Sequence, residues 1–417
     1  MEYFVSNDFL LREVVIPPSK SYAQRAILAA TLGTKPVTLI SVGESDDVQH
    51  FLSMSRQLGA AIADQSTKES NNYQIRGNAY PINRELNAGE SGLGIRLAVP
   101  VAAVMHGDFT LKGEGSLLKR PMTEFASFLP QLGLDVRLTG DYLPISISGN
   151  AVPGELKVDG SLSSQYLSGL LMALPVLNGD SIIHVSNLKS TPYIDITLDV
   201  LKSFGVQVIQ KNYAQFYIKG GQLFDGCESY TVEGDYSGAS NWMVFGALNE
   251  GIAIKGLNPD SVQGDKTMLE ALENAKVPFK WKDKTLYVEA AEIQPFSFDA
   301  THCPDLFPAL VVLAAGAIGK STVYGVKRLI HKESNRALVL QKEMQKLGLK
   351  IVLEGDEMHL FGTGKLTSGT IDSNNDHRIA MAGAIAACLT DKGVHILQAE
   401  SVNKSYPNFW DHFENTL

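Results

Sequence analysis

Hydrophobic and polar positions follow one pattern that recurs five times along this chain. Each copy has a helix end reading L-x-x-L/F-G or similar, then a short apolar strand, a polar turn and a second strand. This order predicts a helix followed by two strands in every copy. The copies cover residues 56–77, 129–149, 201–220, 272–289 and 344–362.

The residue that ends the helix in each copy lies at a nearly fixed spacing. A glycine suits this place because a left-handed residue commonly ends a helix. These residues are Gly59, Gly133, Gly205, Lys276 and Gly348, which are 71 to 74 residues apart. Helix–glycine–strand segments are common in α/β proteins, but a fixed period of this length indicates repeated supersecondary units. A sixth unit would join a terminal helix at 407–417 to strands from 3–16, so the two chain ends are expected to pack together.

Six further segments between these copies have apolar faces and predict second helices. They are residues 22–32, 94–105, 164–174, 239–248, 304–315 and 379–389. Each repeat then holds two helices and several strands, and three repeats in each half make two similar α/β domains. We expect one domain at 15–232 and a second built from 1–14 with 233–417. The chain would cross between them near 12–17 and near 231–237.

Composition narrows the class of protein. The 417 residues suffice for two to four domains of about 100–200 residues, and 44% of them are hydrophobic. Lys and Arg number 36 against 45 Asp and Glu, a net charge of −9, which disfavours a nucleic-acid or anionic-membrane binder but permits a local basic pocket. No signal peptide is apparent, and the longest apolar run, 309–319, is too short to span a membrane. We therefore expect a cytoplasmic protein.

Two segments point to anion binding at helix starts. Lys20 and Ser21 open a helix that carries Arg25, and helix-start N–H groups and the helix dipole attract anions. The plain alternative is a capping serine with two solvated cations. The turn at 89–96 has three glycines in six residues, including Gly92, which permits close approach of a ligand. Its alternative is an ordinary tight turn between a strand and a helix.

Hydroxyl and cationic side chains precede other predicted helices. Arg120 stands directly before a proline and could bind a phosphate or carboxylate with its planar fork, or be a surface cation. Clustered hydroxyls and an amide suit a polyhydroxylated or phosphorylated ligand, although N-capping explains them equally. These side chains are Ser163, Ser164 and Gln165, with Ser190 and Tyr193 one unit later.

Charged residues also gather in the second half. Asp305 begins a helix and could act as a general base or as a dipole partner. His302 and Cys303 beside it could suggest a metal, but there is no second ligand cluster. Lys332 and Arg336 are four residues apart, so in a helix they would share one face, with Glu333 adjacent. Residues 375–378, which end in Arg378, open an apolar helix, and Lys404 follows a strand-like segment.

Taken together, these motifs resemble the EPSP synthase (3-phosphoshikimate 1-carboxyvinyltransferase) family. The resemblance covers essentially the whole chain, with nine motifs in the order of the family. They read PPSKSYAQRAI, LKRPM, GSLSSQYLSGLLMALP, STPYIDITLDVLKSFGV, VEGDYSGASNWM, DATHCPDLFPAL, KRLIHKESNR, NNDHRIAMAGA and NKSYPNFW. The resemblance implies two domains of three βαβαββ-type units each, the inside-out α/β barrel of enolpyruvyl transferases, with helix starts facing a cleft between the domains.

The resemblance also implies a reaction. The enolpyruvyl group of phosphoenolpyruvate (PEP) moves to the 5-hydroxyl of shikimate 3-phosphate by addition and elimination, with release of phosphate, on the route to chorismate and the aromatic amino acids. It implies a monomer that uses no cofactor, metal, nucleic acid or membrane. Asp305 would accept the hydroxyl proton, Glu333 with Lys404 would handle the proton on the PEP methylene, and Lys20 would bridge the substrates.

The family's binding residues transfer to matching positions of this chain. On the shikimate 3-phosphate side they are Lys20, Ser21, Arg25, Ser163, Ser164, Gln165, Ser190, Tyr193, Asp305 and Lys332. On the PEP side they are Lys20, Gly92, Arg120, Gln165, Arg336, Arg378 and Lys404.

The glycine-rich turn departs from the family. It usually reads G-N-A-G-T-A/S-x-R, and here it reads GESGLGIR, so that Glu90 replaces an Asn and Leu93 a Thr. A carboxylate there would repel PEP, and we expect a neighbouring Arg or Lys to hold Glu90. Two alternatives stay open. One is the UDP-N-acetylglucosamine enolpyruvyl transferase, which typically has Lys-Asn where this chain has Lys20-Ser21 and a Cys before its Arg-Pro. The other is an inactive ligand-binding homologue, disfavoured because the catalytic residues are retained.

Overall fold

The chain divides into two compact units. The computed structural model describes residues 1–78, 80–105, 107–330 and 332–414. Unit 1 is Met1–Pro17 with Gly234–Leu417, and unit 2 is Pro18–Glu233. The chain thus passes between the units twice, after Pro17 and after Glu233. The expected domain at 15–232 begins three residues earlier than unit 2 and ends one residue earlier.

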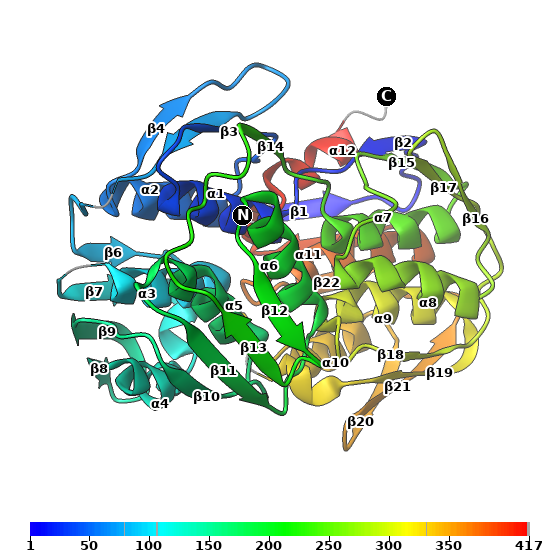
Figure 1. Ribbon diagram of the computed structural model, residues 1–417. Helices are drawn as coiled ribbons and strands as arrows, with labels where there is room; N and C mark the ends of the chain where they lie inside the picture. The colour runs from blue at the N-terminus through cyan, green and yellow to red at the C-terminus, as the bar shows by residue number, and fades with distance from the viewer. Residues whose placement is uncertain (79, 106, 331, 415–417) are drawn as a thin grey trace. The chain divides into compact units, whose positions relative to one another are not determined.

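Unit 2 contains three four-stranded sheets of one design (Figure 1). In each sheet the first two strands run parallel, and the remaining pairings are antiparallel. In spatial order they are β14 (Ser229–Thr231), β3 (Val37–Ile40), β5 (Tyr73–Arg76) and β4 (Ala61–Asp64); β6 (Glu85–Asn87), β7 (Phe109–Lys112), β9 (Tyr142–Gly149) and β8 (Leu134–Thr139); and β10 (Glu155–Asp159), β11 (Ser181–Ser186), β13 (Gln215–Ile218) and β12 (Val208–Lys211).

The three inner helices of unit 2 form the centre of its core. The inner helices are α1 (Lys20–Leu32), α3 (Gly92–Val104) and α5 (Ser164–Ala173), and the outer ones are α2 (Asp46–Gln57), α4 (Thr123–Phe128) and α6 (Pro192–Ser203). Helix α3 buries every residue except Val104. A helix that is apolar on all sides is stable only inside a core, which is why the apolar segments of the sequence become these inner helices.

Unit 1 repeats the design with two four-stranded sheets and one of three strands. The sheets are β2 (Glu13–Val15), β15 (Ile252–Lys255), β17 (Thr285–Val288) and β16 (Phe279–Lys282); β18 (Ser297–Asp299), β19 (Ile318–Tyr324), β21 (Glu357–Thr363) and β20 (Lys350–Glu354); and β22 (Gly369–Asp372), β23 (Val394–Leu397) and β1 (Glu2–Val5). The inner helices are α7 (Tyr236–Leu248), α9 (Phe307–Gly316) and α11 (His377–Ala386), and the outer ones α8 (Met268–Asn274), α10 (Arg336–Lys346) and α12 (Asp411–Glu414). The six second helices that the sequence predicts are therefore confirmed, and they are the inner helices of the two units.

The two ends of the chain lie together in unit 1, as predicted. Strand β1 pairs antiparallel with β23. The ring of Tyr3 stacks on that of Trp410 with centroids 4.3 Å apart, and the N-terminal amine lies 2.8 Å from Glu400 Oε2. Strand β2 differs from the expectation because it joins β15 in another sheet. Residues 415–417 of the predicted terminal helix lie outside the described residues.

The repeated helix ends have the backbone conformation that their spacing predicted. The φ angles of Gly59, Gly133, Gly205, Lys276 and Gly348 are 101°, 82°, 81°, 63° and 89°. In four copies the next N–H donates to the carbonyl five residues back, as from Ala60 to Ser55 and from Val277 to Leu272. This hydrogen bond defines a Schellman cap, so the repeat is confirmed as a repeat of local structure.

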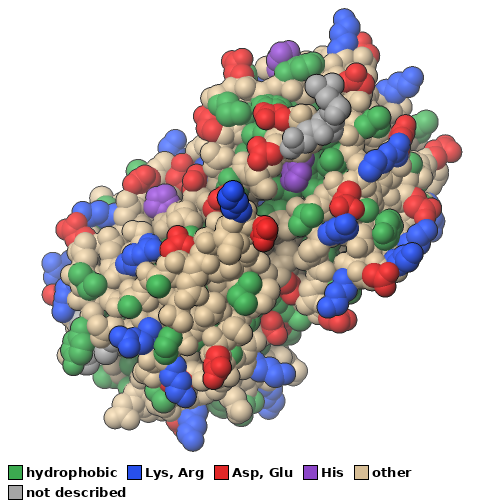
Figure 2. Space-filling model, turned by 90° about the horizontal axis from the view of Figure 1, so that it is seen from above, with side chains coloured by type: hydrophobic (Ala, Val, Ile, Leu, Met, Phe, Trp, Pro, Cys, Tyr) green, Lys and Arg blue, Asp and Glu red, His purple; other side chains and the backbone are tan. Residues whose placement is uncertain are grey.

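The surface carries both signs of charge. On the face drawn in Figure 2, basic and acidic side chains are interspersed rather than separated. Within the described residues, no helix is both long enough and apolar enough to cross a bilayer.

Candidate functional site

Lys20 begins α1 in unit 2 and is held by a carboxylate from the next helix. Its Nζ lies 2.8 Å from Asp47 Oδ2, and the side chains of Lys20 and Asp47 are 16% and 9% exposed. Asp47 is the second residue of α2, where the helix dipole stabilises a negative charge. The ion pair therefore fixes the Lys20 ammonium at the start of α1.

Gln24 connects this ion pair to the glycine-rich turn. Its buried amide donates to the carbonyl of Asp47 at 3.0 Å and to Ser91 Oγ at 2.9 Å. Ser91 caps α3 and accepts a hydrogen bond from the N–H of Gly94 at 3.1 Å. The starts of α1, α2 and α3 are thus tied together by one amide.

The glycine-rich turn and Arg120 are in close contact. A Cβ atom on Gly92 would lie 2.2 Å from Arg120 Nη1, so only glycine lets the guanidinium approach. Arg96 Nη1 donates to the Gly92 carbonyl at 2.9 Å and to Gln165 Oε1 at 3.2 Å. Gly92 thus lies next to Arg120, and Arg96 joins it to Gln165, so three predicted anion-site residues are connected here.

Glu90 accepts hydrogen bonds at the start of a short 3₁₀ helix, Gly115–Lys119. The N–H and Oγ of Ser116 donate to Glu90 Oε2 at 3.0 and 2.7 Å. Because that 3₁₀ helix ends directly before Arg120, Glu90 helps to position the Arg120 segment. The expected Arg or Lys partner of Glu90 stays a prediction.

Arg25 is fully buried and donates to four protein oxygens. Two of them belong to predicted site residues, the carbonyls of Ser21 and Tyr193, at 2.8 and 3.1 Å. The others are Thr197 Oγ1 at 2.8 Å and Ser168 Oγ at 3.2 Å. Burial lowers the pKa of Arg25 to about 10, so the side chain is still charged at neutral pH and joins α1 to α5 and α6.

The remaining predicted residues of unit 2 lie at the starts of α5 and α6. Ser163 caps α5 and accepts from the N–H of Gln165 at 3.3 Å, and Ser164 is buried as its first residue. Ser190 adopts a left-handed conformation, with φ of 57°, and its carbonyl accepts from the N–H of Tyr193. Ser163 thus caps α5, and its contact with shikimate 3-phosphate stays a prediction.

In unit 1, Arg336 is the centre of a buried ionic network. Its guanidinium is fully buried and lies 2.8 Å from Asp305 Oδ1, 2.8 Å from Glu333 Oε2 and 2.9 Å from Asp376 Oδ2. Lys332 Nζ lies 3.1 Å from the same Asp305 oxygen. The predicted shared helical face of Lys332 and Arg336 is wrong, because α10 begins only at Arg336. The two side chains meet through Asp305 instead.

The start of α11 completes this network. Asp376 caps the helix by accepting from the N–H of Arg378 at 3.0 Å, and Arg378 Nη2 lies 3.6 Å from Asp305 Oδ2. Lys404 Nζ donates to the Asn375 carbonyl at 2.8 Å. Six predicted residues from distant segments therefore lie together. We call this set the ionic cluster: Asp305, Lys332, Glu333, Arg336, Arg378 and Lys404.

Charge interactions decide the protonation of the ionic cluster. Burial would raise the pKa of Asp305, but Lys332, Arg378 and Arg336 together hold it well below its usual range. Burial lowers the pKa of Lys332. Against the effect of burial, the carboxylates of Asp376, Glu333 and Asp305 raise the pKa of Arg336. Asp305 is thus a firmly ionised carboxylate surrounded by cations.

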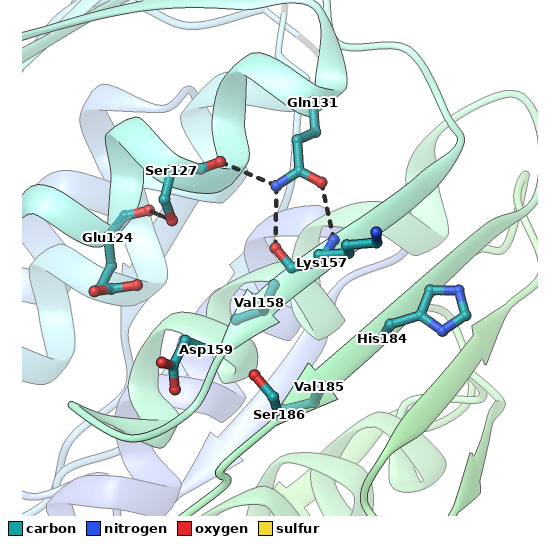
Figure 3. A pocket seen from close by; sticks show the side chains of 9 residues that line it. All are labelled: Glu124, Ser127, Gln131, Lys157, Val158, Asp159, His184, Val185 and Ser186. Carbon is teal, nitrogen blue, oxygen red and sulfur yellow. Dashed lines mark hydrogen bonds between the residues drawn. The ribbon is translucent and has the colours of Figure 1, made fainter.

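An open hollow of about 700 Å³ lies elsewhere on unit 2, beside β10 and β11 (Figure 3). The amide of Gln131 binds both backbone groups of Lys157 there, at 2.9 and 3.0 Å. Burial and the nearby charge of Asp159 raise the pKa of Glu124. None of the predicted site residues lines this hollow, so it is separate from the groups described above.

Comparison with known proteins identifies the family. Residues 8–413 match the family model of EPSP synthase (3-phosphoshikimate 1-carboxyvinyltransferase). The chain belongs to the EPSP synthase family. It is 34% identical over 419 residues to the 3-phosphoshikimate 1-carboxyvinyltransferase of Clostridium kluyveri, covering 100% of this chain and 97% of the relative. The relative from Clostridium acetobutylicum is 36% identical over 403 residues, 95% and 93% of the two chains.

Solved structures show the same fold. The EPSP synthase from Acinetobacter baumannii superposes with a TM-score of 0.82 at 22% identity, covering 100% of this chain and 98% of that one. The enolpyruvyl transferase NikO from Streptomyces tendae gives 0.77 at 16% identity, with 100% and 96% covered. The predicted fold class, two similar α/β domains of the enolpyruvyl transferase type, is confirmed.

Sequence reasoning missed several residues that hold the EPSP synthase motifs in place. Asp47 is one of two acids at a helix start, a pattern too common to single out. Gln24 is one polar residue in an apolar helix, which is a signal of a buried hydrogen bond but not of its partner. Asp376 belongs to the charged segment at 375–378, where Arg378 alone was chosen as a site residue.

Proposed function

We propose that this chain transfers the enolpyruvyl group of PEP to the 5-hydroxyl of shikimate 3-phosphate and releases phosphate. The observation that carries the proposal is the ionic cluster, in which family-matching cations surround Asp305. Membership of the EPSP synthase family supports it and favours this activity over transfer to UDP-N-acetylglucosamine and over an inactive homologue.

The two units would contribute different groups to one reaction. Unit 2 would supply Lys20 and most residues of the shikimate 3-phosphate side, together with Gly92, Arg120 and Gln165 on the PEP side. Unit 1 would supply the ionic cluster. The fully buried Arg25 would act through the backbone that carries Ser21 and Tyr193. We further propose that a monomer in the cytoplasm does this work on two small-molecule substrates.

The charges of the ionic cluster suit two anionic substrates. Phosphate and carboxylate groups would pair with Arg336, Arg378 and Lys404, and such pairs are strong where water is excluded. Pairing would also weaken the hold of these cations on Asp305 and raise its basicity. Asp305 could then accept the 5-hydroxyl proton, while Glu333 with Lys404 would deliver and remove the proton on the PEP methylene.

Phosphate release tests the proposed function directly. The full chain is incubated with PEP plus shikimate 3-phosphate and, in parallel, with PEP plus UDP-N-acetylglucosamine. We expect phosphate only in the first mixture. Release only with the sugar nucleotide would select the sister transferase, and release in neither would identify an inactive homologue.

A Gly92→Ala variant is expected to raise the KM for PEP by about tenfold or more. The new Cβ would meet Arg120 Nη1 at 2.2 Å and displace the guanidinium, and a shift of about 1 Å in a positioning group can cost up to about 10²-fold. Gly154→Ala is the matched control, because nothing lies within 4 Å of its added Cβ. An unchanged KM for PEP would contradict the assignment of Gly92 and Arg120 to PEP.

A further inference from the structure

Asp265 is a buried acid of unit 1 that the proposed function does not use. It lies in a 3₁₀ helix, Gly264–Thr267, and is 3% exposed. Ser237 Oγ, near the start of α7, donates to Asp265 Oδ2. Asp265 Oδ1 accepts no hydrogen bond from any described residue. Burying a carboxylate oxygen without a hydrogen bond lowers the stability of the fold. A role in binding would explain why Asp265 occupies this position.

The 3₁₀ helix that carries Asp265 lies beside the ionic cluster. Thr267 Oγ1 donates to Cys303 Sγ at 3.4 Å, two residues before Asp305, and Asp305 Oδ2 lies 3.6 Å from Arg378 Nη2. Arg378 at the start of α11 attracts Asp265, whereas Asp305 before α9 and Asp235 before α7 repel it. Burial, and after it the charge of Asp265, raises the pKa of the Cys303 thiol. Burial, reinforced by the charge of Asp305, raises the pKa of Asp265 to about 6, and Arg378 and Ser237 oppose that rise. Asp265 is therefore mostly ionised above neutral pH, and Arg378 is one of the groups that keep it so.

We propose that Asp265 is a positioning residue that takes up a proton when an anionic group of PEP pairs with Arg378. This inference rests on the proposed function, because that function supplies PEP as the anion. An anion on Arg378 cancels the attraction that stabilises the charged acid. A proton from solvent then binds the unpartnered Oδ1, no other bond changes, and the proton returns to solvent when the anion leaves.

Proton uptake gives the binding of PEP a definite pH dependence. In the complex the proton is held up to a higher pH than in the free protein. Affinity for PEP therefore rises as the pH falls from the titration of Asp265 in the complex to its titration in the free protein at about 6, by about tenfold for each pH unit that separates the two. Above both titrations Asp265 is charged in either state and opposes the incoming anion.

Two variants change the charge of Asp265 by independent means. Asp265→Asn imitates the protonated acid, and we expect about a tenfold lower KM for PEP at about pH 8 and a flatter dependence of KM on pH. Ser237→Ala removes the donor that stabilises the charged acid, so its KM profile should move in the same direction. Ser240→Ala, one turn further along α7, is the control. The titration of PEP itself affects the KM of every variant equally, so it cancels when each variant is compared with the unaltered chain.

The opposite results would overturn the inference. One is an Asp265→Asn profile of KM against pH that runs parallel to that of the unaltered chain. The other is a loss of kcat with unchanged KM, which is the result of a purely structural role. If Asp265→Asn does not fold, the profile of Ser237→Ala decides.

Calorimetry separates this inference from the proposed function. PEP binding is measured at neutral pH in two buffers of different ionisation heat, which gives the number of protons taken up. The unaltered chain should take up more protons per PEP than Asp265→Asn, whose side chain does not titrate. Absence of turnover with shikimate 3-phosphate would refute the proposed function alone, whereas equal proton uptake in these two proteins would refute the role of Asp265 alone.

Discussion

A Lys20→Met variant is expected to lose about 10²- to 10³-fold in kcat/KM for both substrates. In the proposed function the Lys20 ammonium bridges two anions, and methionine keeps the length of the side chain without its charge. The loss should appear in phosphate release at saturating as well as limiting PEP. A kcat/KM within about threefold of the unaltered chain would remove Lys20 from the site.

The same variant should remain folded. Replacing Lys20 removes its ion pair with Asp47, but the start of α2 still stabilises that carboxylate through the helix dipole. We expect unit 2 to lose about 1–2 kcal/mol of unfolding free energy, measured by circular dichroism during thermal unfolding. Lys35→Met is the control, since Lys35 is an exposed cation of the same unit, and it should change neither activity nor stability.

An Arg336→Met variant is expected to lower the free energy of unfolding of unit 1 by about 3–5 kcal/mol. Arg336 is fully buried against three carboxylates, and Asp376 is fully buried as well. Among the described residues, Arg336 is the only cation in an ion pair with Asp376. Removing it therefore leaves a buried charge uncompensated. All three tryptophans, Trp242, Trp281 and Trp410, belong to unit 1, so their fluorescence during urea unfolding reports on that unit.

Two further variants make this second result specific. Lys342→Met removes an exposed cation near Glu343, and its effect should stay within about 0.5 kcal/mol. Adding Asp376→Asn to Arg336→Met should recover part of the lost stability, because asparagine still caps α11 but carries no charge. A double variant that is no more stable than Arg336→Met would show that packing volume, rather than the buried charge, is responsible.

The repeat could be predicted from the sequence because its determinants are local. A left-handed residue after a helix and the N–H that donates five residues back involve neighbours in the chain, as at Gly59 and Lys276. The inner helices could be predicted from the sequence as well, because an apolar segment such as α9 can be stable only when it is buried on all sides. The closure of the chain by β1 followed from counting units, although the place of β2 did not.

The motif residues themselves also came from the sequence, but their partners did not. Lys20 and Asp47 are 27 residues apart, and Arg336 and Asp376 are 40 apart. Such ion pairs join the starts of different helices, and their geometry depends on how those helices pack. No local pattern carries that information. For this reason Lys332 and Arg336 were placed on one helical face, whereas the fold brings both to Asp305.

The sequence by itself thus determined the repeated units, the inner helices and the family motifs, because each of these depends on short-range hydrogen bonding, on burial of apolar segments or on residue identity. Only the tertiary structure decided which carboxylate meets which cation, and so which acids are firmly ionised and which titrate near neutrality. The reason is physical. The protonation of a buried acid depends on charges a few ångströms away in space, and at Asp265 and Asp305 those charges come from helices far apart in the chain.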